Sequence, residues 1–422
     1  MIKLRVSNLY SLCCLAAIAV VSASGQAVDA GKTENSFNSL TRTEMDMLVA
    51  DAVRSKPEIL QRFAEDPDLK RLQIQQVREL LAFASQAQKE GMTADPTNRQ
   101  ELENIRAEII AVNYDKMLNK GKPATPAFGN ITTAQVAKYW SVAGHEPEFA
   151  RFLDAKMMLV GAETPDRKLT AEETSQARDV FARTQIYLAE YESKLKSGAL
   201  ASEMVASTDL SVKLQQAQFL SRLYAEKVAD KVKVTDAEIA AYFTAHPKID
   251  PARRRAEAQR ILERAKAGEN FAALANEFSE DPGNIAENGA KSGGLYKDVP
   301  VGRFLAEFET AALALQPGQV APELVETDHG YHVIKLERKL GKKRPADEAT
   351  FDVRHILIST NVEDPDSPDG ASVPAAEFVR RKLESEKEKA LIAKLILENK
   401  VQVPDDFTLP TPATAKPPVR NR

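Results

Sequence analysis

Two of the chain's five histidines lie inside short apolar segments, where an imidazole has few solvent partners. His332 is the third residue of GYHVIKL (330–336), and His355 is the third residue of VRHILI (353–358). Imidazole can donate, accept or transfer a proton near neutral pH, so such a pair could serve acid–base chemistry. Two buried imidazoles can also form a hydrogen-bonded pair that only stiffens a sheet. The residue types alone leave both interpretations open.

The composition argues against several other kinds of site. The cysteines are Cys13 and Cys14, and together with five scattered histidines they do not predict a zinc site or another metal centre. With 57 basic and 61 acidic residues, the net charge of −4 gives no basic surface typical of nucleic-acid binding. A chain of 422 residues is long enough for two or three domains, each with its own core.

The elements that would position the histidines follow from the sequence between residues 253 and 338. Apolar side chains recur at i, i+3, i+4 and i+7 in two stretches, which predicts two amphipathic helices. A turn-forming loop, SEDPG at 279–283, and a second loop with Gly293-Gly294 follow. A short helix continues to Leu315, and a turn then leads into the segment that holds His332. The apolar positions of the two helices are Ala258, Ile261, Leu262, Ala265, Phe271, Leu274, Ala275 and Phe278.

The order of these motifs closely resembles the parvulins, a family of peptidyl-prolyl cis–trans isomerases of the PpiC or rotamase type. Each motif is common by itself, but the ordered set is hard to produce by chance. The resemblance covers about a fifth of the chain directly. It implies an enzyme with no nucleophile, metal or cofactor, which lowers an amide-rotation barrier of about 18–20 kcal/mol by favouring the twisted amide. The motifs are SEDPG (279–283), GGLY (293–296), AEFE (306–309), LQPGQ (315–319) and GYHVIKL (330–336).

The resemblance also implies a polar set beside a pocket for the proline ring. The polar, catalytic positions are His332, His355, Asp281 and Thr327. The substrate-binding positions are Phe304, Phe308 and one of Leu295 or Tyr296. Because the reaction moves no proton obligatorily, a structural histidine pair is favoured over direct proton transfer. Asp281 could instead bond only turn amides, and Phe308 could be ordinary core as well as pocket.

One strand of the parvulin pattern is out of place. Parvulins normally open with a strand similar to RHILI, but none lies between His246 and Arg253. A strand of that type occurs once, at 353–358, after the segment that should be last. We therefore expect an α+β fold: a mostly helical module and a small strand-permuted parvulin-like domain, residues 247–360, with a four-stranded antiparallel sheet.

The displaced strand should fill the central slot of the sheet by a direct hairpin, because an empty slot would leave backbone groups unpaired. Setting His332 opposite His355 places Leu336 opposite Phe351 and the turn just after Lys343. The two-residue alternation of apolar side chains agrees with this pairing. A strand donated by a second subunit and the stub of a truncated second domain are the alternatives.

Residues 38–245 predict helices throughout, as a chaperone-like module. Residues 234–243 are similar to the connection into the isomerase domain of SurA-like and PrsA-like proteins. Residues 361–370 have the character of an acidic solvent loop. Segment 374–407 holds a helix, from about 374 to 399, that resembles the C-terminal helix with which SurA-like chaperones return to their helical module. Residues 408–422 are expected to be a disordered tail. Capping boxes are predicted at Thr41/Glu44, Thr132/Gln135, Thr170/Glu173 and Thr235/Glu238.

The N-terminus predicts an export signal, residues 1–27. Lys3 and Arg5 precede an apolar stretch from Leu9 to Ala23, and small residues follow. That stretch is short for a membrane span, so attachment through an uncleaved signal is the less favoured alternative. Both cysteines lie inside the signal, which suits an oxidising compartment. We expect a secreted, periplasmic bacterial protein.

These features together predict an isomerase and folding chaperone that acts on unfolded or proline-containing exported polypeptides. The main alternative is a non-catalytic holdase whose parvulin-like domain only binds peptide. A third interpretation is a helical adaptor with a decayed domain. Whether Asp281, His332 and His355 converge on Phe308 separates these possibilities.

Overall fold

The fold was analysed in a computed structural model. The structure describes residues 36–55, 62, 65–123, 125–161, 168–285, 288–339, 349–365 and 370–406. The predicted signal and the predicted tail lie outside these residues. Within the described ranges, no helix combines the length and apolar character that crossing a membrane requires. The chain divides into two compact units: a helical unit, up to Lys231 and again from Lys389, and a sheet unit, Val232–Glu388.

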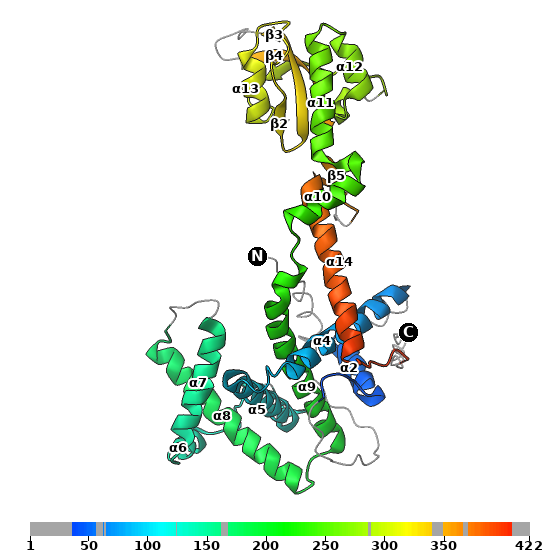
Figure 1. Ribbon diagram of the computed structural model, residues 1–422. Coiled ribbons are helices and arrows are strands. Elements are labelled where there is room, and N and C mark those ends of the chain that lie inside the picture. Colours follow the sequence, from blue (N-terminus) through cyan, green and yellow to red (C-terminus); the bar gives the residue numbers. More distant parts are fainter. Residues whose placement is uncertain are drawn as a thin grey trace, which may run out of the picture. The chain divides into compact units, whose positions relative to one another are not determined.

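The helical unit is built on long helices whose starts are encoded locally. All four predicted capping boxes are confirmed, since each threonine hydroxyl accepts from the backbone of the residue three positions on. The core contains Tyr114, which meets Tyr187 edge-on with ring centroids 5.4 Å apart. Helix α9 packs on α4 and α5, and α5 also packs on α8 (Figure 1). The helices are α2 (Arg42–Ser55), α4 (Pro67–Lys89), α5 (Pro96–Asn119), α6 (Thr133–Trp140), α7 (His145–Gly161), α8 (Ala171–Lys196) and α9 (Ser202–Val228).

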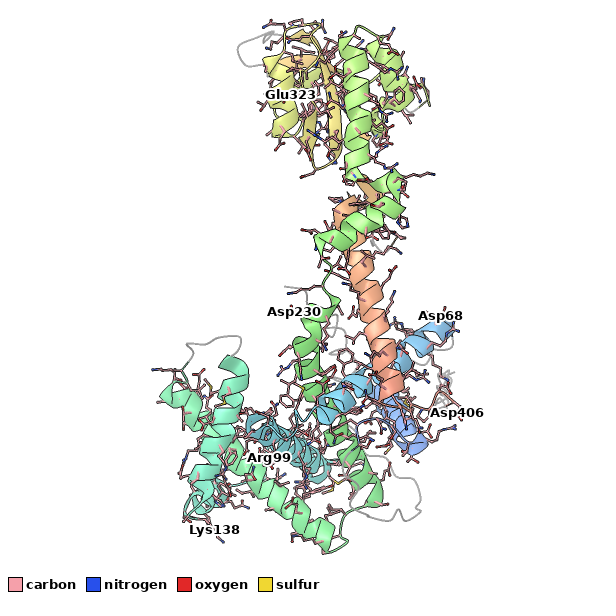
Figure 2. The ribbon with its side chains drawn as sticks, in the orientation of Figure 1. Asp68, Arg99, Lys138, Asp230, Glu323 and Asp406 are labelled. Carbon is pink, nitrogen blue, oxygen red and sulfur yellow. The ribbon has the colours of Figure 1, made fainter. Side chains whose placement is uncertain are left out.

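The end of the described chain belongs to this helical unit. Leu40 donates its N–H to the carbonyl of Gln402 at 2.9 Å, and Gln402 donates to the carbonyl of Asn38 at 2.8 Å. These bonds join the two ends of the described chain within one unit. Polar residues such as Arg99 on α5 and Lys138 on α6 are exposed on the helices of this unit (Figure 2).

The sheet unit contains the predicted four-stranded antiparallel sheet. Its order is β1-β4-β3-β2, so β4 pairs with β3 on one side and with β1 on the other. The displaced strand therefore fills a central slot of the sheet from its own chain, which confirms the hairpin interpretation over a strand donated by a second subunit. The strands are β1 (Leu295–Pro300), β2 (Val325–Thr327), β3 (Gly330–Lys339) and β4 (Thr350–Ser359).

The predicted register of this hairpin is wrong by two residues. His332 lies opposite Leu357, Ile334 opposite His355, and Leu336 opposite Val353 rather than Phe351. A shift of two keeps every side chain on its predicted face, because the side-chain period of a strand is two. The histidines are therefore diagonal neighbours, not direct partners. The predicted turn after Lys343 lies outside the described residues.

Helices cover both faces of the sheet. Val333 and Ile356 face α11 (Pro251–Lys266) and α12 (Phe271–Phe278), and the two predicted apolar stretches form these helices. Ile334 and Val353 alternate to the opposite face and pack with Phe308 of α13 (Ala306–Ala314). Figure 1 shows α13 on one side of the strands and α11 with α12 on the other. His332 and His355 share the α13 face by this alternation.

The segments that flank the sheet pack together. Val379 is fully buried beside Ile239, and the Arg380 guanidinium pairs with Asp236 at 2.8 Å. The prediction of a solvent loop at 361–370 is wrong for its first three residues, which form β5 and pair antiparallel with β6. The predicted C-terminal helix is present. These elements are α10 (Asp236–Ala245), η3 (Pro247–Ile249), β5 (Asn361–Glu363), β6 (Ser372–Pro374) and α14 (Ala375–Glu398).

Candidate active site

Four polar side chains form one continuous hydrogen-bonded chain at the sheet. His355 Nε2 lies 2.9 Å from Asp281 Oδ2, and His355 Nδ1 lies 3.3 Å from His332 Nδ1. His332 Nε2 lies 2.8 Å from Thr327 Oγ1. Tyr296 adds a hydroxyl that donates to Asp281 Oδ2 at 2.6 Å. The structure thus brings together all four residues of the predicted polar set.

Phe308 lies at the meeting point of the two imidazoles. Its ring is edge-on to His332 at 5.3 Å and to His355 at 5.2 Å, measured between centroids. Phe304 packs on it at 4.7 Å, and Tyr296 meets Phe304 edge-on at 5.4 Å. Phe308 is only 2% exposed, whereas Phe304 and Tyr296 are half-buried. The accessible aromatic faces therefore belong to Phe304 and Tyr296, with Phe308 behind them.

Hydrogen-bonding rules assign the protons of this chain when both imidazoles are neutral. An ionised Asp281 can only accept, so His355 donates from Nε2 and accepts at Nδ1. His332 must then donate from Nδ1 and accept at Nε2. The Thr327 hydroxyl donates to His332 Nε2, and its oxygen accepts the backbone N–H of His329 at 3.2 Å. Every polar atom along the chain has a partner, as buried polar groups require.

Burial and neighbouring groups favour a neutral His332 and an ionised Asp281. Burial is the main cause that lowers the pKa of His332 to about 3, and a positive charge on His355 or His329 would lower it further. Burial would raise the pKa of Asp281, but hydrogen bonds from His355 and Tyr296 outweigh it and lower the pKa to about 2. Burial, followed by the bond to Asp281, raises the pKa of the Tyr296 hydroxyl. At neutral pH, His332 is therefore neutral and Asp281, on the far side of His355, is ionised.

The stability of the sheet unit is expected to depend on pH through His332. The unfolded chain binds a proton there below pH 6.5, and the folded chain does not until about pH 3, so stability falls as the pH falls through that window. The expected loss is at most about 1.4 kcal/mol per pH unit. Urea unfolding of the sheet unit at several pH values should show a flatter curve for His332→Gln. Parallel curves for the two proteins would contradict this assignment.

Two glycines permit the close approaches at the site. A Cβ on Gly283 would lie 1.7 Å from the Tyr296 hydroxyl oxygen, so a side chain there would push the tyrosine away from Asp281. Gly294 has φ +71°, and its Cβ would lie 2.2 Å from the carbonyl oxygen of His355. Its own carbonyl accepts the His355 N–H at 3.0 Å. Only glycine suits a position with both constraints.

The register of β1 separates Leu295 from Tyr296. Tyr296 lies opposite Val353, on the α13 face that also carries the histidines, and Leu295 lies opposite Arg354, on the other face. The structure therefore does not bring Leu295 to the site. His329 is exposed in the turn between β2 and β3, where its N–H bonds Thr327.

Two further residues that sequence reasoning missed hold the site together. Glu309 is 8% exposed, and its carboxylate accepts the N–H groups of Gly302 at 2.9 Å and Phe304 at 2.8 Å, which fixes the loop that carries Phe304. Asn284 is 1% exposed and accepts the N–H of Gly294 at 2.7 Å. The sequence offered one signal for Glu309: an acidic residue stands directly after Phe308, in a helix expected to pack on the core, where a carboxylate needs hydrogen-bond donors.

No group of three or more His, Cys, Asp or Glu side chains in the described part of the chain could hold a metal ion. The site itself presents hydrogen-bonding groups beside aromatic rings. Such a site can hold an apolar ring against Phe304 and Tyr296 and keep the polar groups beneath it in fixed orientations.

Comparison with known proteins agrees with this geometry. Residues 242–338 match the family described as "Rotamase: PPIC-type PPIASE domain". The chain is 32% identical over 178 residues to Foldase protein PrsA 4 of Bacillus cereus, covering 41% of this chain and 60% of that protein. It is 30% identical over 208 residues to Chaperone SurA of Ralstonia nicotianae, covering 43% of this chain and 40% of that protein. The chain thus spans less than two thirds of these relatives, and the family match ends before β4 begins.

Proposed function

We propose that this chain, which carries a rotamase domain of the parvulin type and is similar to PrsA foldases and SurA chaperones, is a peptidyl-prolyl cis–trans isomerase and folding chaperone. The observation that carries the proposal is the convergence of Asp281, His355 and His332 on Phe308, at the core of the matched domain. A decayed domain would not be expected to keep four polar side chains in one satisfied chain.

The site would act by shape and fixed polarity rather than by bond-making. A proline ring would rest on Phe304 and Tyr296, with Phe308 supporting them from behind. Such a surface favours the amide in its twisted form if the neighbouring peptide groups are held out of plane. His332 and His355 are each 5% exposed, so their role would be to hold the floor of the site in one arrangement.

The chaperone half of the proposal rests on the helical unit and on the names of the relatives. Long amphipathic helices with mixed faces could shield unfolded segments while the sheet unit turns over prolyl bonds. The predicted signal at 1–27 supports export, and we propose a periplasmic location with unfolded, proline-containing polypeptides as substrates.

Isomerase activity can be measured directly on the mature chain. A tetrapeptide with one prolyl bond, followed by a protease-coupled or NMR exchange assay, should isomerise faster with the protein than without it. The rate should fall when Phe304→Ala removes the accessible aromatic face. No acceleration with any apolar residue before proline would contradict the enzymatic half of the proposal.

Holdase activity is expected to reside in the helical unit. Residues 28–231, joined by a flexible linker to 389–406, should suppress the aggregation of an unfolded test protein as measured by light scattering. This shortened protein should fold, because it keeps both chain segments that bond each other through Leu40 and Gln402. Full aggregation in the presence of that folded protein would contradict the chaperone half.

A non-catalytic holdase is the second candidate, and one observation favours it. Neither imidazole of the site is more than 5% exposed, so the polar chain could exist only to stabilise a peptide-binding sheet. In that case the prolyl peptide would bind, by chemical-shift change, without any increase in its exchange rate.

A further inference from the structure

The loop that carries Asp281 is attached to the end of β4 by three alternating hydrogen bonds. Leu357 donates its N–H to Ser279 Oγ at 3.2 Å, and Glu280 donates its N–H to the Leu357 carbonyl at 2.8 Å. Ser359 donates its N–H to Glu280 Oε2 at 2.8 Å. The loop therefore runs beside β4 for its two residues before Asp281.

Arg254 closes this attachment from α11. Its Nε donates to the Ser359 carbonyl at 3.0 Å, its Nη1 pairs with Glu257 at 2.8 Å, and its Nη2 pairs with Glu280. Its side chain is only 16% exposed. The neighbouring Arg253 is 66% exposed, whereas Arg254 faces the sheet.

This attachment helps to fix the position of Asp281. Consecutive Cα atoms are about 3.8 Å apart, so fixing Glu280 at both its backbone and its side chain leaves Asp281 little freedom. Asp281 then meets His355 Nε2 at 2.9 Å and the Tyr296 hydroxyl at 2.6 Å. Its own turn holds it as well, since its Oδ1 accepts the Gly283 N–H at 3.1 Å and its carbonyl accepts the Asn284 N–H at 2.9 Å, while its backbone N–H donates to the Ser279 hydroxyl at 3.4 Å.

We propose that Arg254 and Glu280 form a clasp that positions Asp281 against His355, which makes Arg254 a positioning residue for the site although it touches none of the site's aromatic rings. The effect of the clasp on isomerase activity rests on the proposed function. Its effect on the Asp281–His355 contact does not.

The first test is the titration of the Asp281 carboxyl, followed by 13C NMR in the full chain. Arg254→Met should raise its pKa from about 2 towards the ordinary value of 3.8, because the carboxylate leaves the imidazole. Glu280→Ala should raise it as well. A purely electrostatic effect predicts the opposite sign for Glu280→Ala, since removing a negative neighbour lowers a carboxyl pKa. A fall or no change in Glu280→Ala would overturn the proposal.

The second test is activity with matched controls. Arg254→Met should lower kcat/KM for a prolyl peptide by about tenfold, since small misplacements at a site have large effects on rate. Arg254→Lys should have a kcat/KM between those of the wild type and Arg254→Met, because lysine keeps the positive charge. Arg253→Met, one residue away and solvent-facing, should match the wild type in both measurements.

The two proposals fail separately. An inactive wild-type protein would remove the proposed function, while the Asp281 titration would still decide on the clasp. An active wild-type protein with unchanged kcat/KM and unchanged titration in Arg254→Met would overturn the clasp alone. Glu280 is 44% exposed, so its unpaired carboxylate can be hydrated and Arg254→Met should remain folded.

Discussion

Replacing residues 350–359 with a Gly/Ser segment of equal length is expected to unfold the sheet unit and abolish isomerase activity while the helical unit stays folded. β4 is central and pairs on both sides, so its loss leaves β1 without its neighbour and exposes the backbone groups of β3 that faced β4. It also removes apolar side chains that are at most 8% exposed, each worth about 1.5–3 kcal/mol. The summed contribution of these side chains is as large as the net free energy of unfolding of a typical domain, about 5–15 kcal/mol. The side chains are Phe351, Val353, Ile356, Leu357 and Ile358.

Unfolding should be followed by the loss of sheet-unit signals in 1H–15N spectra, with those of the helical unit retained. The same replacement at 361–363, in the short β5, is the matched control and should leave the sheet intact. A peptide of residues 349–360 added in trans should restore some signals. Retention of the β3 signals after replacement of β4 would contradict the central role of this strand.

Phe308→Ala is expected to reduce kcat/KM by about a hundredfold and stability by about 3–5 kcal/mol. The ring is 2% exposed and contacts both imidazoles and Phe304. Its removal leaves a void in which His332, His355 and Phe304 can all move. His332→Ala should have the smaller effect on activity, because the reaction transfers no proton obligatorily.

The control for Phe308 is a phenylalanine on the other face of the same sheet. Phe271, the first residue of α12, is 6% exposed and belongs to the core that α11 and α12 form with β3 and β4. Phe271→Ala should cost similar stability, measured by thermal unfolding, but should keep kcat/KM within about twofold when both proteins are assayed well below their melting temperatures. An equal loss of activity in both variants would mean that Phe308 acts only through stability.

The sequence predicted the face of each strand residue but not its partner. Alternation of apolar side chains placed His332 and His355 on one face, and that is where they lie. The register was set by assuming that the histidines face each other directly. The structure instead sets His332 opposite Leu357, and it adds a bulge between Leu336 and Arg338; the alternation of side chains specifies neither feature, because a shift of two leaves every face unchanged.

Short-range contacts between distant segments were harder to anticipate. Arg254 stands in a run of three arginines, a pattern that is typical of a solvated helix face, and only the tertiary fold brings Glu280 to it. Likewise β5 has three residues in an acidic, proline-rich stretch, so propensity alone favoured a loop. The motifs of the site could be recognised in the sequence because they occur in a specific order. The residues that support the site, such as Asn284 and Arg254, belong to no such motif, and only the tertiary fold brings them to it.

The place of β4 in the chain also orders the events of synthesis. Among the described strands, β1 is an edge strand whose neighbour is β4, and β4 is the last of the four strands to be made. While a nascent chain ends before Ser359, β1 and β3 have no common neighbour, and the sheet lacks its middle. Domains generally fold as units once their residues are available. In whichever compartment the chain folds, this sheet is therefore expected to stay open until its closing strand is available.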